Sequence, residues 1–207
     1  MSFFKFLKST SFFKQILLAF TGIFIVVFAL KQGLEISTNH DQKIQVPDLN
    51  KMVLKDVDRT LKALDLDFIV SCWDSVSLDL VEEHLDVKYH KVASALATDK
   101  TFLQKLNDTK KPIILSVGMC TQEEVDAAVE ILDNVEYILA CTSTYPTKAD
   151  ELNLKYIHTL KEQYPNIKVG FSNHYNGLDA CVGSIAFGAE CVEFHICLLY
   201  TSDAADE

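Results

Sequence analysis

Six apolar segments of this 207-residue chain end in side chains that can do chemistry, and two of these endings carry histidine. His174 follows KVGFSN and His195 follows ECVEF, so the two imidazoles can meet if the segments are neighbouring strands. Imidazole nitrogens are common ligands of divalent cations, although two histidines can equally well end two strands without binding a metal. Glu193 shares the strand face of His195, which makes it a candidate ligand, acid/base group or salt-bridge partner.

Lysine and hydroxyl side chains occur at the same segment ends. Lys91 is flanked by apolar residues, and a buried ammonium requires an anionic partner such as a phosphate or a carboxylate. The alternative is a surface lysine whose stem alone is buried. Gly118 permits close backbone approach, and backbone N–H groups together with hydroxyls can surround phosphate oxygens. The hydroxyl candidates, each of which is alternatively a simple strand terminator, are Ser94, Ser116, Ser143 and Ser172.

The apolar segments predict β-strands that begin near residues 67, 88, 112, 136, 168 and 190. A capping box at Thr121–Glu124 starts the clearest of the intervening helices. Near-continuous apolar strands separated by amphipathic helices indicate a parallel sheet in an α/β protein, built as a barrel or as a doubly wound sheet. The other helices are expected at Leu78–Leu85, Lys100–Leu106, Leu152–Tyr164 and Leu178–Phe187.

Polar residues end nearly every predicted strand, including Ser71 with Asp74 and Thr142 with Ser143. An open sheet gathers its ligands at one switch point, whereas a barrel collects side chains from many strand ends into one ring. We therefore expect a TIM-type (β/α)₈ barrel. It is expected to be incomplete, because such a barrel has eight strands and six are present.

Several motifs together resemble the N-acetylneuraminate (sialic acid) synthase family over about residues 67–196. They are CWDSVS, YHKVASALAT, KPIILSVGMCTQEEVDAAVEIL, CTSTYPTKADELNLKYIHTLKEQYP and VGFSNHYNGLDACVGSIAFGAECVEFHI. The resemblance implies a TIM barrel that condenses phosphoenolpyruvate with N-acetylmannosamine or a related aldose, using Mn²⁺ or Mg²⁺. The order of TSTYP, SNH and EFH favours this family over other phosphoenolpyruvate aldolases.

The resemblance also assigns roles to residues. Lys91, Ser94, Ser116, Ser143 and Ser172 match positions that bind phosphoenolpyruvate, with Lys91 in a catalytic, electrostatic role. His174 and His195 match the metal ligands, and Glu193 matches a catalytic acidic residue near the sugar.

The chain also departs from the family pattern. The family commonly has Ser-Asp-His where this chain has Ser172-Asn173-His174. Its first two strands and its C-terminal antifreeze-like domain have no counterpart here, so we expect an inactive fragment. The family-type homodimer is expected only with that missing domain.

Composition excludes several classes of protein. Hydrophobic residues make up 49% of the chain, and only 7 Gly and 4 Pro are present, so collagen-like and wholly disordered chains are excluded. The formal charge is −10, and no cluster of Lys and Arg provides the basic surface that nucleic-acid binding requires. The six cysteines form no C-x-x-C pair, so buried free thiols are expected rather than a disulfide framework or a zinc site.

The amino-terminal segment has a different character from the remainder. Residues 15–32 contain the uncharged run QILLAFTGIFIVVFAL, which predicts a single transmembrane helix. Basic residues in 1–14 place the amino terminus in the cytoplasm and the following chain outside. A cleaved signal peptide is the alternative. The synthase part is nevertheless typical of the cytoplasm.

Residues 43–67 resemble the first part of a PASTA module, the extracellular repeat of bacterial cell-wall proteins, with VPDL at its start and helical spacing from Leu54 to Leu64. Residues 197–207 resemble a translated sequencing adapter. We therefore expect a truncated chimera. The alternative function is a membrane-anchored, non-enzymatic cell-wall-binding protein.

Overall fold

Six short parallel strands form one sheet. The computed structural model describes residues 52–195, and within them the strands pair in the order β1-β2-β3-β4-β5-β6. A doubly wound sheet reverses its strand order at the switch point, whereas a (β/α)₈ barrel adds each strand beside the previous one. The predicted incomplete barrel is therefore confirmed for this part of the chain. The strands are β1 (Val70–Ser71), β2 (His90–Val92), β3 (Ile113–Ser116), β4 (Val135–Cys141), β5 (Lys168–Asn173) and β6 (Val192–Phe194).

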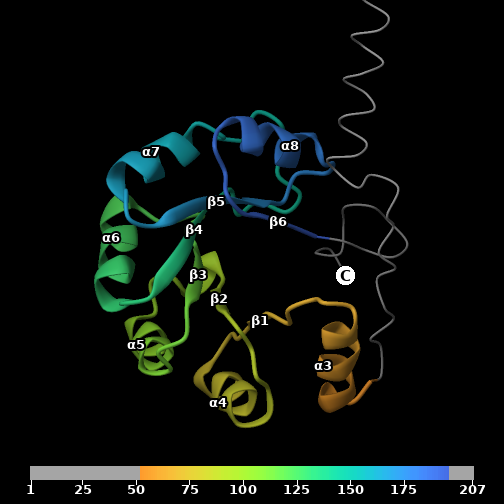
Figure 1. Cartoon of the computed structure of the whole chain (residues 1–207). Coiled ribbons are helices and arrows are strands. Elements are labelled where there is room, and N and C mark those ends of the chain that lie inside the picture. The colour runs from red at the N-terminus through yellow and green to blue at the C-terminus, as the bar shows by residue number, and fades with distance from the viewer. Residues whose placement is uncertain (1–51, 196–207) are drawn as a thin grey trace, which may run out of the picture. The chain divides into compact units, whose positions relative to one another are not determined.

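Helices cover one side of this sheet and leave the other side facing the barrel interior. Figure 1 shows α4 to α8 in an arc around the outside of the curved sheet. Each helix connects two neighbouring parallel strands, as the parallel pairing requires. The helices are α3 (Leu54–Ala63), which precedes β1, then α4 (Ser75–His84), α5 (Lys100–Asp108), α6 (Gln122–Ile131), α7 (Tyr156–Gln163) and α8 (Asp179–Ala186).

Local capping decides where two of these helices begin. The Thr121 hydroxyl accepts the backbone N–H of Glu124, and the Glu124 side chain accepts that of Thr121, so the predicted capping box of α6 is present. Asp74 accepts the backbone N–H groups of Val76 and Ser77 at 2.8 and 2.7 Å. Asp74 is therefore the cap of α4 and not a member of the polar rim, and α4 begins before the expected Leu78.

The core lies between the sheet and its helices. All four residues of β3 are buried, which explains why Ile113, Ile114 and Leu115 are apolar on both faces of the strand. The helices contribute buried side chains toward the outer face of the sheet, including Leu78, Phe102, Leu103, Val125, Ile157 and Leu160. Within the described residues, the five cysteines are free thiols, as predicted.

Several expected segments lie outside the described residues. These are the basic residues 1–14, the membrane helix at 15–32, residues 43–51 of the PASTA-like segment, and the tail at 197–207. The helix expected between Leu54 and Leu64 is present as α3. Across residues 52–195, no helix is sufficiently long and apolar to cross a bilayer.

Candidate functional site

The register of the last three strands places polar side chains side by side. Cys141 on β4 pairs with Ser172 on β5, which in turn pairs with Glu193 on β6. Because side chains at the same register level of a sheet point to the same face, these three groups face the barrel interior together. Lys91 on β2 and Ser116 at the end of β3 line the same cavity as Cys141 and Ser172, and Lys91 also contacts Glu193.

One cavity brings most of the predicted site residues together. It has a volume of about 260 Å³ and lies at the carboxyl ends of the strands. Its lining includes all five residues predicted to bind phosphoenolpyruvate, together with one of the two histidines. They are Lys91, Ser94, Ser116, Ser143, Ser172 and His174.

The Ser116 hydroxyl is the strongest sign that this cavity takes a ligand. Ser116 is only 2% exposed, and its Oγ has no hydrogen-bond partner in the described part of the protein. A buried hydroxyl without a partner is destabilising, so native proteins rarely retain one without a reason. Here the unpaired oxygen lines a polar cavity, where a bound ligand can supply the missing hydrogen bond.

Gly118 brings the backbone close to the same cavity. Its N–H donates to the Ser94 Oγ at 2.9 Å. A Cβ at this position would lie 3.1 Å from that oxygen and 3.0 Å from the Cys141 Sγ, and it would overlap the Ser143 Oγ. Only glycine therefore fits. The result is a cluster of two cavity-lining hydroxyls, those of Ser94 and Ser143, packed against the Gly118 backbone, and hydroxyls of this kind can bind an oxyanion.

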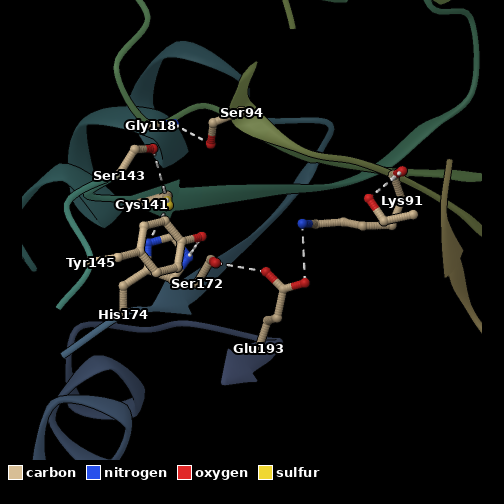
Figure 2. Close-up of polar contacts among 10 residues, drawn as sticks. Lys91, Ser94, Gly118, Cys141, Ser143, Tyr145, Ser172, His174 and Glu193 are labelled. Carbon is tan, nitrogen blue, oxygen red and sulfur yellow. Dashed lines mark hydrogen bonds and ion pairs between the residues drawn. The ribbon is translucent and has the colours of Figure 1, made fainter. Parts of the chain in front are cut away.

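Lys91 and Glu193 form an ion pair across the interior of the sheet. The Lys91 Nζ lies 3.0 Å from the Glu193 Oε1, and the Ser172 hydroxyl donates to the Oε2 at 2.6 Å (Figure 2). Burial alone would raise the pKa of Glu193, but the Lys91 ammonium and the Ser172 hydroxyl outweigh it and lower that pKa. Glu193 is therefore ionised at neutral pH. It lines an adjoining cavity of about 360 Å³, which Lys91 also borders.

His174 is fixed by hydrogen bonds at both ring nitrogens. Its Nδ1 lies 2.7 Å from the carbonyl oxygen of Thr142, which can only accept, so we assign the proton to Nδ1. Its Nε2 then accepts from the Tyr145 hydroxyl at 2.6 Å. Burial lowers the pKa of His174, with the Thr142 carbonyl opposing this effect, and the neutral ring is favoured. Burial also raises the pKa of Tyr145 to about 12, which keeps the phenol protonated.

The second histidine lies beside the first, as the strand ends predicted. The ring centroids of His174 and His195 are 5.2 Å apart, with the planes inclined by 22°. Imidazole nitrogens are common ligands of divalent cations. Between residues 52 and 195, no group of three or more His, Cys, Asp or Glu side chains could hold a metal. A cation held by this pair would complete its coordination with water or substrate oxygens, as Mg²⁺ commonly does.

Sequence reasoning missed several residues around the cavity. Cys141 lies within it, and burial raises the pKa of its thiol, so it is protonated. The large side chains of Trp73, Met119 and Tyr145 line the same cavity while remaining 62%, 71% and 48% exposed. They form an apolar rim around the opening. Tyr145 belongs to the TSTYP motif, which was a usable signal, whereas nothing in the local pattern singled out Trp73 or Met119.

Comparison with known proteins identifies the family of this chain. The family model described as the NeuB family matches residues 29–207. The chain belongs to the NeuB family. The match includes the segments at 43–67 and 197–207 that the sequence motifs alone did not connect with the barrel.

Named NeuB-family relatives include two synthases from Campylobacter jejuni. Pseudaminic acid synthase is 39% identical over 56% of this chain and 35% of its own length. N,N'-diacetyllegionaminic acid synthase is 31% identical over 76% of this chain and 48% of its own length. This chain thus spans less than half the length of these curated relatives.

A solved structure supports the same fold. The N-acetylneuraminic acid (sialic acid) synthetase of Leptospira borgpetersenii, solved in complex with citrate, is similar with a TM-score of 0.65 and 27% identity. The similarity covers 68% of this chain and 50% of that one.

Proposed function

We propose that this chain carries the phosphoenolpyruvate-binding and metal-binding part of a nonulosonic acid synthase. Its reaction would condense phosphoenolpyruvate with N-acetylmannosamine or a related aldose. The observation that carries the proposal is the unpaired, buried Ser116 hydroxyl in the cavity that Lys91, Ser94 and Gly118 surround. Family membership supports the same chemistry.

The phosphoenolpyruvate site is proposed to work by electrostatics and position. Lys91 supplies a positive charge that is only 12% exposed and is therefore weakly screened by solvent, and an anionic ligand would share this charge with Glu193. The hydroxyls of Ser94, Ser116 and Ser143 supply donors around the phosphate and carboxylate oxygens, whereas the Ser172 hydroxyl donates to Glu193 at the edge of the site. Such preorganised groups stabilise charge without reorganising during the reaction.

His174 and His195 are proposed to hold Mn²⁺ or Mg²⁺. The ion when bound would act as a Lewis acid toward the aldehyde oxygen of the open-chain sugar. C3 of phosphoenolpyruvate would then attack the aldehyde carbon, water would add to the resulting cationic C2, and phosphate would leave. Glu193, ionised beside Lys91, is positioned to accept a proton in this sequence, from the attacking water for example.

The rim of Trp73, Met119 and Tyr145 is proposed to contact the aldose. Aromatic and thioether side chains that stay 48–71% exposed at a cavity mouth can pack against the apolar face of a sugar or an acetamido methyl group. We place this reaction in the cytoplasm, where phosphoenolpyruvate is made. A membrane anchor at residues 15–32 remains a prediction.

The proposal is tested by calorimetric titration with phosphoenolpyruvate, in which the affinity of the wild-type chain is compared with that of Ser116→Ala. This variant removes the unpaired hydroxyl, so it should stabilise the fold by about 1 kcal/mol while weakening phosphoenolpyruvate binding. Ser184→Ala is the matched control, because Ser184 is equally buried but donates to the Cys181 carbonyl at 2.7 Å. The control should lose stability and keep its affinity.

Two results would contradict the proposed function. One is the absence of phosphoenolpyruvate binding at millimolar concentration by the wild-type chain. The other is an unchanged affinity in both Ser116→Ala and Lys91→Ala.

A further inference from the structure

The hydrogen bond between Tyr145 and His174 occupies an atom that the proposed metal site needs. The Tyr145 hydroxyl lies 2.6 Å from the His174 Nε2, while the Nδ1 of the same ring is bound to the Thr142 carbonyl at 2.7 Å. Both nitrogens of the imidazole are therefore already in use. A neutral imidazole offers one lone pair, and in this ring it is on Nε2.

A metal ion and a hydroxyl proton cannot share that lone pair. Because the Thr142 carbonyl keeps the proton on Nδ1, the ring cannot offer its other nitrogen instead. We propose that Tyr145 is a gate on the metal site: its hydroxyl holds the His174 Nε2 in the metal-free protein, and a divalent cation must displace it to bind. This inference rests on the proposed role of His174 as a metal ligand.

The surroundings allow the Tyr145 side chain to move while its neighbours remain fixed. Its ring stacks on His174 with centroids 3.9 Å apart, yet the residue is 48% exposed at the rim of the cavity. The nearby backbone is held separately, because the Thr147 N–H donates to the His174 carbonyl at 2.9 Å. Rotation of the Tyr145 side chain therefore breaks one hydrogen bond and its ring contacts with His174 and His195. Exposed side chains rotate within nanoseconds, so the movement is fast.

Figure 2 shows the geometry that the gate requires. The phenol ring of Tyr145 lies over the imidazole of His174, and its hydroxyl reaches the Nε2. The centroid of the Tyr145 ring is also 5.7 Å from that of His195. The Tyr145 side chain thus lies against both proposed metal ligands. When its hydroxyl leaves the His174 Nε2, both histidines become accessible together.

The test is a titration of the full chain with Mn²⁺, in which electron paramagnetic resonance measures the concentration of free Mn²⁺. Tyr145→Phe keeps the stacked ring and removes only the competing hydroxyl. We expect it to bind Mn²⁺ about fivefold more tightly than wild type, the equivalent of one hydrogen bond that no longer has to be broken. Tyr137→Phe is the control and should match wild type, because Tyr137 lies on β4 with its ring beside that of Tyr89, 6.4 Å between the centroids.

The outcomes separate this inference from the proposed function. His174→Ala should abolish Mn²⁺ binding; if it binds as wild type does, the metal assignment fails, and the gate fails with it. If His174→Ala loses binding but Tyr145→Phe binds no more tightly than wild type, the gate alone is overturned. As a second readout, Mn²⁺ should change the tyrosine ultraviolet absorption of wild type, and this change should be absent in Tyr145→Phe.

Discussion

Lys91 and Glu193 sit on β2 and β6 and meet across the concave side of the sheet, with 3.0 Å between the Nζ and the Oε1. Of the three strands between them, β5 contributes a hydroxyl to the same network through Ser172. The Lys91 side chain is 12% exposed and that of Glu193 is 37% exposed, so the two charges differ in their access to water. An unpaired Lys91 would therefore be the more costly of the two.

Glu193→Gln should thus destabilise the chain more than Lys91→Met does. The double variant should lose less stability than the sum of the single variants, with a coupling of about 1–2 kcal/mol, since solvent partly screens the Glu193 side. Urea unfolding of the four proteins measures this coupling. Strictly additive losses would show that the ion pair does not stabilise the fold.

Gly118→Ala should disrupt the oxyanion cluster. The new methyl group would press on the hydroxyls of Ser94 and Ser143 and on the Cys141 thiol. We expect a loss of about 1–3 kcal/mol in the free energy of unfolding and no measurable phosphoenolpyruvate binding. Gly183→Ala on α8 is the control: its methyl group meets only the flexible end of Leu154 at 3.3 Å, so its effect should stay within about 1 kcal/mol. Full binding by Gly118→Ala would rule out close ligand approach at this backbone position.

Asn173→Asp should weaken the loop that follows β5. The Asn173 Nδ2 donates to the carbonyls of Tyr175 and Gly177 at 3.0 and 3.1 Å, and its Oδ1 accepts from the Tyr175 N–H. An ionised Asp keeps the acceptor, loses both donors, and places a negative charge beside two carbonyl oxygens. Thermal or urea unfolding should show a loss of about 2 kcal/mol, at least as large as that of Asn173→Ala. If Asn173→Asp were as stable as wild type, the Asn173 amide would not be required for the stability of this loop, although the family commonly has Asp at this position.

Most of the fold could be predicted because its signals are local or periodic. Both faces of β3 are buried, so its first three residues, Ile113–Leu115, are apolar, and the Thr121 capping box marks the start of α6 directly. The meeting of His174 and His195 followed from a simple rule: the carboxyl ends of neighbouring parallel strands lie at one edge. The role of Asp74 as a helix cap could also have been predicted from the sequence, since Ser77 follows three residues later and completes a capping box.

What could not be predicted depends on contacts between distant residues. Tyr145 reaches His174 only because the segment after β4 folds back, with Thr147 bridging to the residues after β5. The sequence likewise does not predict that the Ser116 hydroxyl is unpaired, because this depends on the absence of a hydrogen-bond partner among all the residues packed around it. Local pattern therefore identified most of the site, and tertiary packing determined how its members interact.

His90 makes the stability of the chain depend on pH. It lies beside Lys91 on β2 but faces the helix layer, and its side chain is 1% exposed. Its Nε2 is 3.0 Å from the Glu82 Oε1, without the angles of a hydrogen bond, and Lys111 binds the same carboxylate at 2.7 Å. Burial lowers the pKa of His90 below its ordinary value of 6.5; Glu82 opposes this shift and Lys111 adds to it.

The sign of the pH effect follows from that shift. Below about pH 6.5 the unfolded chain binds a proton at residue 90 that the folded chain does not, so acid favours unfolding. The free energy of unfolding should fall as pH decreases from about 6.5 toward the lowered pKa, by up to about 1.4 kcal/mol per pH unit for one such histidine. His174 contributes in the same direction, because burial also lowers its pKa.

Urea unfolding at a series of pH values should show that the free energy of unfolding depends less steeply on pH in His90→Asn than in wild type. His84→Asn is the control, because His84 is 51% exposed at the end of α4; a dependence as steep in His90→Asn as in wild type would contradict this assignment.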